Sequence, residues 1–230
     1  MENEKDKYWL ATNSHASARL NLQHFWNQLS CGYLIHPDIA FNGSARIADI
    51  GTEKWNIHES VPEYLLGQYD VVNIRYFALV VRKDNLSRLL RNLISLLKPG
   101  GYLQWIEINI AEQQIVSARP DTSMAATSSF SEDGKKAIAT LGVRFDWLND
   151  LPSIYQEFGL VEASQFKPDP IPALRPMSSY LAIGGWEEFS YNVLDKKGAH
   201  PLLGSGQDLR RRLNDVRNET QTGAAIEQLH

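Results

Sequence analysis

The sequence contains a single cysteine, Cys31, among its 230 residues. An intrachain disulfide is therefore excluded, and the composition fits a reducing compartment. No apolar run approaches the roughly 18 residues that a membrane span requires. The first residues, Met-Glu-Asn-Glu-Lys-Asp-Lys, are too charged for a signal peptide. These absences predict a cytoplasmic protein, with the nucleus as the second expectation.

An excess of basic residues is also missing. The chain has 23 Lys and Arg against 27 Asp and Glu, which gives a formal net charge of −4. Nucleic acids and anionic membranes both select basic surfaces, so neither is expected as a partner, and a small molecule is favoured. No Cys/His cluster has the spacing of a metal site, and we expect no bound metal.

Apolar patterning in the first half predicts strands joined by a helix. Residues 45–51 and 69–77 read as buried strands, and leucines across 86–97 repeat at helical spacing. A turn follows at Lys98-Pro99-Gly100-Gly101, and a third strand is expected over 102–110. Strand, helix, turn and strand in this order predict a βαβ crossover in a mostly parallel α/β sheet.

The flanking regions are predicted to be mainly helical. The expected elements are a helix from Ser14 or Ser17 to His36, an irregular segment over 111–134, a helix over 151–158, an edge strand over 160–166, and two further helices over 177–194 and 208–216. The resulting domain prediction has three parts: an N-terminal polar segment and helical cap (1–44), a truncated Rossmann-like core (45–167), and a Pro-rich connector with a helical C-terminal region (168–230).

The stretch after the first strand lacks what a nucleotide site needs. Asp49 and Gly51 stand at the carboxyl end of that strand, where a parallel sheet opens its ligand crevice. The chain then reads Thr-Glu-Lys-Trp-Asn-Ile-His-Glu, without a second or third glycine and without an apolar-periodic helix to present free N–H groups. We interpret this as a cofactor-binding fold in which half of the cofactor site is missing.

Several blocks taken together resemble the fungal S-adenosylmethionine-dependent methyltransferases of specialised metabolism, the LaeA-like and UMTA-like group. The resembling blocks are residues 19–24, 32–37, 45–51 (Ala-Arg-Ile-Ala-Asp-Ile-Gly), 61–72 and 89–105. The resemblance implies a seven-strand Rossmann-like class I fold, S-adenosyl-L-methionine as cofactor, and methylation of an oxygen of a small metabolite.

The chain departs from that family in length. Asp49 and Asp70, which mark the family's first and fourth strands, are 21 residues apart. A single βαβ unit takes about 30 residues, so two such units cannot fit between them. The family's last antiparallel strand is also missing. We therefore expect a truncated, mostly parallel sheet with N-terminal and C-terminal helices, whose exposed edges a homo- or hetero-oligomer partner or the first helix would cover.

The resemblance also implies roles for individual residues. The cofactor contacts would come from Asp49, Gly51, Thr52, Asn73, Arg75 and from Asn56, which replaces an acidic residue that faces the adenine in the family. His24, His36 and Glu107 are the candidate catalytic residues. Gln23, Tyr33 and Trp105 are the candidate substrate contacts.

Most of these residues also have a structural interpretation. A plain strand-to-turn junction is the alternative for Asp49 and Gly51, and core packing is the alternative for Trp105. An ion pair with Asp49 or Glu107 is the alternative to substrate binding for Arg75. At the level of function, the alternatives to an active methyltransferase are a methyltransferase-like cyclase or metabolite-binding scaffold, and an inactive truncated product.

Overall fold

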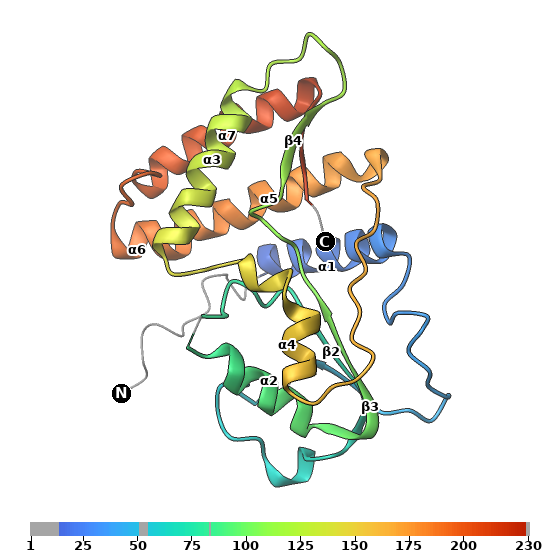
Figure 1. Cartoon of the computed structure of the whole chain (residues 1–230). Helices are drawn as coiled ribbons and strands as arrows, with labels where there is room; N and C mark the ends of the chain where they lie inside the picture. The colour runs from blue at the N-terminus through green and yellow to red at the C-terminus, as the bar shows by residue number, and fades with distance from the viewer. Residues whose placement is uncertain (1–13, 51–54, 83, 229–230) are drawn as a thin grey trace. The chain divides into compact units, whose positions relative to one another are not determined.

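The computed structural model describes residues 14–50, 55–82 and 84–228 (Figure 1). The chain divides into two compact units, which we describe separately. Unit 1 comprises residues 1–32, 109–142 and 168–229, and unit 2 comprises residues 33–108 and 143–167. Residues 33–44 thus group with the predicted core, and residues 109–142 group with the terminal helices.

Unit 2 is built on a three-stranded parallel sheet. Its strands are β1 (Ile47–Ile50), β2 (Tyr69–Arg75) and β3 (Leu97–Ile106), in the order β1-β2-β3. The parallel strands that the sequence predicts are therefore confirmed. The region 55–68, all described, contains a 3₁₀ turn (Glu63–Leu65) and no α-helix, so β1 and β2 are neighbours without a helical crossover between them in these residues.

The expected turn at Pro99–Gly101 lies inside β3, which is a correction. Gly101 explains how the strand continues: a Cβ at this residue would lie 3.0 Å from the backbone oxygen of Asp70 and 3.1 Å from that of Tyr69. The close backbone approach coincides with a register shift between Tyr69 and Val71, after which Val71 pairs with Tyr102. This irregularity sets which β3 residue faces each residue of β2.

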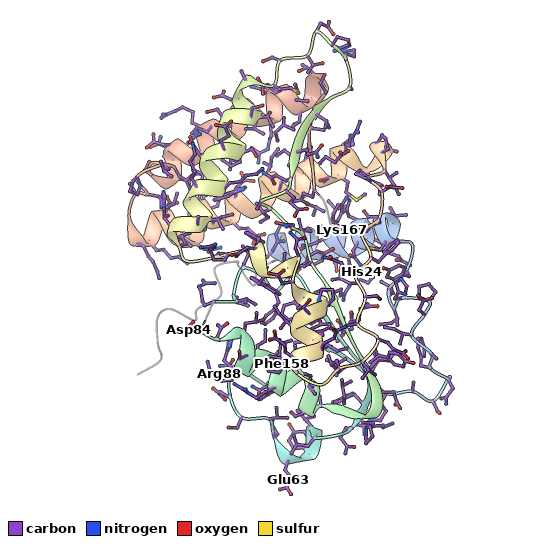
Figure 2. All side chains as sticks on the ribbon, in the orientation of Figure 1. His24, Glu63, Asp84, Arg88, Phe158 and Lys167 are labelled. Carbon is purple, nitrogen blue, oxygen red and sulfur yellow. The ribbon has the colours of Figure 1, made fainter. Side chains whose placement is uncertain are left out.

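One face of the sheet carries the core of unit 2. Helix α2 (Leu86–Ser95) buries Leu89 and Leu93. These leucines pack in one cluster with Ala48 of β1 and with Val72 and Ile74 of β2. Helix α4 (Leu151–Glu157) lies beside α2, since the Arg91 guanidinium sits 5.7 Å from the ring centre of Phe158 (Figures 1 and 2). Because side chains alternate along a strand, Asn73 and Arg75 point to the opposite face from Val72 and Ile74.

Unit 1 is a helical assembly with a small antiparallel sheet. Its elements are α1 (Ser14–Cys31), β4 (Gln114–Ser117), α3 (Ala125–Thr140), a 3₁₀ turn (Pro172–Leu174), α5 (Arg175–Phe189), a π-helical turn (Ser190–Leu194), α6 (Asp195–Lys197), α7 (Gly206–Thr222) and β5 (Ala224–Glu227). β4 pairs antiparallel with β5. Buried side chains of α3, α5, α7 and β5 form one core, including Phe130, Phe189, Leu209, Leu213 and Ile226.

Local chemistry explains where α7 begins and ends. Ser205 and Asp208 form a capping box, in which each side chain accepts from the other residue's backbone N–H. Gly223 ends the helix with φ +120°, a conformation open to glycine. β5 follows at once and docks on α5, because Ser178 Oγ donates to the Ile226 carbonyl (2.7 Å) and Ser179 Oγ accepts from the Ile226 N–H (2.8 Å).

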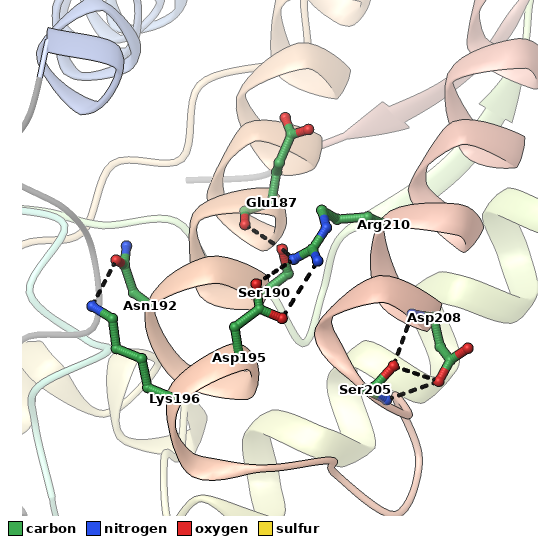
Figure 3. Close-up of polar contacts among 8 residues, drawn as sticks. All are labelled: Glu187, Ser190, Asn192, Asp195, Lys196, Ser205, Asp208 and Arg210. Carbon is green, nitrogen blue, oxygen red and sulfur yellow. Dashed lines mark hydrogen bonds and ion pairs between the residues drawn. The ribbon is translucent and has the colours of Figure 1, made fainter.

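The start of α7 also packs tightly against the π-helical turn (Figure 3). Arg210 Nη1 donates to Ser190 Oγ (3.0 Å) and to Asp195 Oδ2 (2.9 Å). Gly206 leaves room for this arrangement: a Cβ there would lie 2.0 Å from Asp195 Oδ1 and 2.8 Å from the Ser190 carbonyl. The glycine is therefore required by close approach.

Three other expectations need correction. Residues 111–134 are not irregular, because β4 and much of α3 fall within them. Residues 160–166, all described, form no strand. The first helix ends at Cys31 and not at His36, because Gly32 takes a φ of +80° and terminates it. In the described part of the chain, no helix is both long and apolar enough to cross a bilayer.

Candidate functional site

A row of polar side chains crosses the sheet of unit 2 on the face opposite to α2. Asp49, Asn73 and Gln104 occupy the same register position on β1, β2 and β3. Asn73 Nδ2 donates to Asp49 Oδ1 (3.0 Å), and Gln104 Nε2 donates to Asn73 Oδ1 (2.9 Å). We call these three residues, with Arg75, the polar row. It lies near the carboxyl ends of the strands, where parallel sheets bind ligands.

Arg75 completes the row through an ion pair with Asp49. Its Nη2 donates to Asp49 Oδ2 over 2.5 Å. Of the two carboxylates that the sequence offers as partners, Asp49 is the one in contact. The Arg75 side chain is 20% exposed and the Asp49 side chain 37% exposed, so this end of the row is accessible to a ligand. Asn73 and Gln104 are buried.

At the other end of the row, Gln104 forms hydrogen bonds with the backbone of residues 34–36, which follow α1. Gln104 Nε2 also donates to the Leu34 carbonyl (2.8 Å), and Gln104 Oε1 accepts from the His36 N–H (2.7 Å). The side chains of Tyr33, His36 and Phe166 contact one another, with ring centres 4.8, 5.6 and 6.0 Å apart. We call these three the aromatic group. His36 Nδ1 accepts from the Asp38 N–H (3.2 Å), so the neutral ring carries its proton on Nε2.

Glu107 holds the turn that leaves β2. Its Oε2 accepts from the N–H groups of Phe77 and Ala78 (2.7 Å each) and from Trp105 Nε1 (3.2 Å), and its Oε1 accepts from Ile108 N–H (3.1 Å). Burial of the carboxyl raises the pKa of Glu107 to about 7, although these four donors oppose the shift. Tyr76 in the same turn has φ +57°, a strained conformation for a bulky residue.

The predicted residues thus fall into separate groups. Trp105 points to the face opposite to Gln104 and meets Trp147 edge to face, with ring centres 5.2 Å apart. Glu107 contacts Trp105 and not the polar row in the hydrogen bonds described above. A single pocket formed by Tyr33, Arg75, Trp105 and Glu107 is therefore not supported by these contacts.

Other predicted residues lie elsewhere. Gln23 and His24 are on α1 in unit 1, where Gln23 Oε1 accepts from Arg19 Nη1 (3.2 Å) and His24 meets Phe25 (Figure 2). Asn56 forms a local turn, accepting from the His58 N–H (3.1 Å). Gly51 and Thr52 lie outside the described residues. Across the described positions, no three His, Cys, Asp or Glu side chains are arranged to hold a metal ion.

The contacts of two residues in the site could not be predicted from the sequence. Gln104 is the hub of the row, and its only signal is a polar side chain within an apolar strand. Phe166 belongs to the aromatic group. The sequence instead predicts that Phe166 is the last residue of an edge strand. Neither position can be recognised before the strand register and the path of residues 160–167 are known.

Comparison with known proteins gives one short similarity. No family model matches the chain. The chain is 40% identical over 55 residues to a protein described as methyltransferase grgD from a Penicillium species. The aligned stretch is 24% of this chain and 19% of that protein, so about a fifth of the relative's length is represented. This local similarity supports a relationship to a methyltransferase family.

Proposed function

We propose that the chain is an S-adenosylmethionine-dependent methyltransferase of the LaeA-like and UMTA-like group, and that it methylates an oxygen of a small metabolite. One observation carries the proposal: a chain with local similarity to a methyltransferase places an accessible acid–base pair, Asp49 and Arg75, near the carboxyl ends of parallel strands. Ligands of open α/β sheets bind at this edge.

The chemistry of the polar row fits the amino-acid end of S-adenosylmethionine. That end carries a carboxylate and an ammonium group. A guanidinium recognises a carboxylate through directed N–H donors, and a carboxylate such as that of Asp49 accepts from an ammonium group. Arg75 and Asp49 would therefore hold this end of the cofactor. Because Asn73 and Arg75 donate to the two oxygens of Asp49, the carboxylate is already fixed in one orientation.

The cofactor supplies a methyl group bonded to a positively charged sulfur. The residues of the chain have to bind and orient the acceptor and remove its proton. The aromatic group offers ring faces and edges beside the polar row on which a planar metabolite can pack. Proximity and orientation supply most of the acceleration in such a displacement.

Of the candidate catalytic residues, Glu107 has a pKa suited to accepting a proton, but its carboxyl contacts Trp105 on the face opposite to the polar row, so we propose no proton transfer to it from an acceptor bound at that row. A carboxyl with a pKa of about 7 can take a proton close to neutral pH, which is the condition for efficient general-base catalysis. His36 lies beside the row, but its Nδ1 already accepts from the Asp38 N–H, so it is not proposed as the proton acceptor either.

Calorimetric titration of the full chain with S-adenosylmethionine tests the proposal directly. We expect saturable heat, and we expect Asp49→Asn and Arg75→Gln each to weaken binding about tenfold or more, which corresponds to about 1.4 kcal/mol. Asp146→Asn is the matched control, because Asp146 pairs with Arg144 on the exposed surface of the same unit. No heat at millimolar cofactor would refute the proposal.

A further inference from the structure

Gln104 sits at the junction between the polar row and the segment around His36. It is a buried carboxamide, 8% exposed, with two hydrogens on Nε2 and an acceptor oxygen. The two hydrogens go to the Leu34 carbonyl and to Asn73 Oδ1, and the oxygen accepts from the His36 N–H. Every hydrogen that its amide can donate is therefore used.

These contacts fix the direction of the Gln104 amide. A reversed amide would set Nε2 against the His36 N–H and Oε1 against the Leu34 carbonyl, so that a donor would face a donor and an acceptor an acceptor. Because both positions are backbone groups, they cannot exchange roles. The backbone of residues 34–36 thus dictates which side of Gln104 donates toward β2.

The orientation of the Gln104 amide also fixes which atom of Asn73 faces Asp49. Since Gln104 donates to Asn73, Asn73 must present Oδ1 to it and Nδ2 to Asp49. Asn73 is also buried, at 5% exposed, so water cannot readily replace either partner. The Asp49 carboxylate receives this donor on one oxygen and Arg75 on the other. The hydrogen bonds therefore run without interruption from the His36 backbone to the Asp49–Arg75 pair.

We infer that Gln104 is the positioning residue of this site: its amide couples the conformation of residues 34–36, which carry part of the aromatic group, to the placement of the Asp49–Arg75 pair. A metabolite that shifts the aromatic group would then alter the pair, and a ligand on the pair would order the aromatic group, because coupling between two sites is reciprocal. The inference rests on the proposed function only in treating Asp49 and Arg75 as ligand contacts.

Nuclear magnetic resonance on the ligand-free chain tests the coupling from the far end. In Arg75→Gln we expect hydrogen exchange of the His36 amide to become at least about fivefold faster, although Arg75 does not contact His36 in the hydrogen bonds described. Arg144→Gln is the matched control, because it breaks an exposed ion pair in the same unit and should leave the His36 amide unchanged. An unchanged His36 amide in folded Arg75→Gln would overturn the inference.

The reverse experiment changes Gln104 and observes Arg75. Gln104→Glu keeps the shape of the side chain but removes both donors, and we expect the guanidinium resonances of Arg75 to shift and broaden. Gln68→Glu, which introduces the same charge beside Arg46, is the control and should leave them in place. Gln104→Met, uncharged and similar in size, replaces the glutamate variant should that variant unfold, as judged by circular dichroism. Unmoved Arg75 resonances in a folded Gln104 variant, or failure of both Gln104 variants to fold, would reduce Gln104 to a structural role.

These results are separable from those on the cofactor. If Arg75→Gln weakens binding of S-adenosylmethionine but leaves the His36 amide unchanged, the proposed function stands and the coupling is wrong. If the chain binds no cofactor but the His36 amide responds, the coupling stands by itself.

Discussion

Arg75 on β2 reaches across to Asp49 on β1 and donates to its Oδ2 over 2.5 Å. Asp49 is in register with Asn73, so the arginine extends back along its own strand to make this contact. The reach places a cation and an anion together near the carboxyl ends of two neighbouring strands. Both charges remain partly exposed, and this combination distinguishes the pair from a buried structural bridge such as Arg19–Glu188 in unit 1.

Breaking the Asp49–Arg75 pair should lower the stability of the chain moderately. Arg75→Gln leaves a half-buried carboxylate with one charged donor fewer, and we expect the free energy of unfolding in urea to fall by about 1–2 kcal/mol. Arg144→Gln removes an arginine whose ion pair is largely exposed, and its effect should stay within about 0.5 kcal/mol. If the two substitutions lowered the free energy of unfolding equally, the Asp49–Arg75 pair would contribute no more to stability than an exposed surface pair.

Glu107 should make stability depend on pH in the direction opposite to an ordinary paired acid. Its pKa is about 7 in the folded chain, above the ordinary value of 4.5, so the folded state holds a proton that the unfolded state has released. Its stabilising contribution is therefore full below pH 4.5 and is lost as the pH rises through 7. The total effect is at most about 3 kcal/mol.

The measurement compares urea unfolding of the wild type and Glu107→Gln between pH 4.5 and 8. The difference between the two curves should change with pH over this window, whereas Glu63→Gln, at an exposed position of the same unit, should run parallel to the wild type (Figure 2). Parallel curves for Glu107→Gln would mean that the carboxyl titrates at its ordinary pKa.

Glu219 should stabilise unit 1, and its contribution should change with pH in the direction opposite to that of Glu107. Partial burial of this carboxyl is outweighed by hydrogen bonds from Ser123, Thr127 and Ala126 near the start of α3, which hold its pKa at about 2. Its contribution is present above pH 4.5 and is lost as the pH falls through 2. We expect Glu219→Gln to cost about 1 kcal/mol at pH 7, as for loss of a helix cap, and progressively less as the pH falls through 2. Glu132→Gln, exposed on α3, serves as the control in the same unfolding experiment.

Two glycines in unit 1 should respond oppositely to alanine. Gly206→Ala forces its new methyl group onto the Ser190 carbonyl and the Asp195 carboxylate, and we expect a loss of about 2 kcal/mol or more. Gly185→Ala lies in α5 with no atom within 4 Å of the added Cβ, so it should be neutral or stabilise the helix by up to about 1 kcal/mol. Thermal unfolding distinguishes them, and a neutral Gly206→Ala would show that the π-helical turn yields easily.

Local patterns in the sequence were sufficient to predict α2 and the presence of three parallel strands in unit 2, but not the bounds of β3, which runs over Leu97–Ile106 and includes the expected turn. Ala48 and Ile50 of β1, β-branched residues of β2 and leucines of α2 pack in one cluster, which is the pattern that periodicity reports. Ile47 is 41% exposed, although the sequence predicts a buried strand there. The segment containing β4 and α3 escaped prediction for a physical reason. The first three turns of α3 bury Thr127, Ser131 and Gly134 beside Phe130, so this part of its packed face consists largely of small residues that give no apolar periodicity.

The candidate site was predictable only in part. The sequence indicates that Arg75 needs a carboxylate, but the choice of Asp49 over Glu107 follows from the alternation of side chains on β2 and β3, and so from the register. Gln104 meets Asn73 because the strands shift register near Tyr69, an irregularity that coincides with the close backbone approach at Gly101. Strand register depends on residues far apart in the sequence, so the local sequence around Gln104 does not predict its pairing with Asn73.

The burial of β5 has a consequence for biosynthesis. Its four residues are all buried, and Ile226 completes a core whose other members come mainly from α3, α5 and α7. Among the described elements of unit 1, α1 leaves the ribosome before all others and β5 after all others. The early helix therefore emerges without its eventual neighbours, and we expect chaperones that shelter nascent polypeptides to raise the yield of soluble chain during expression.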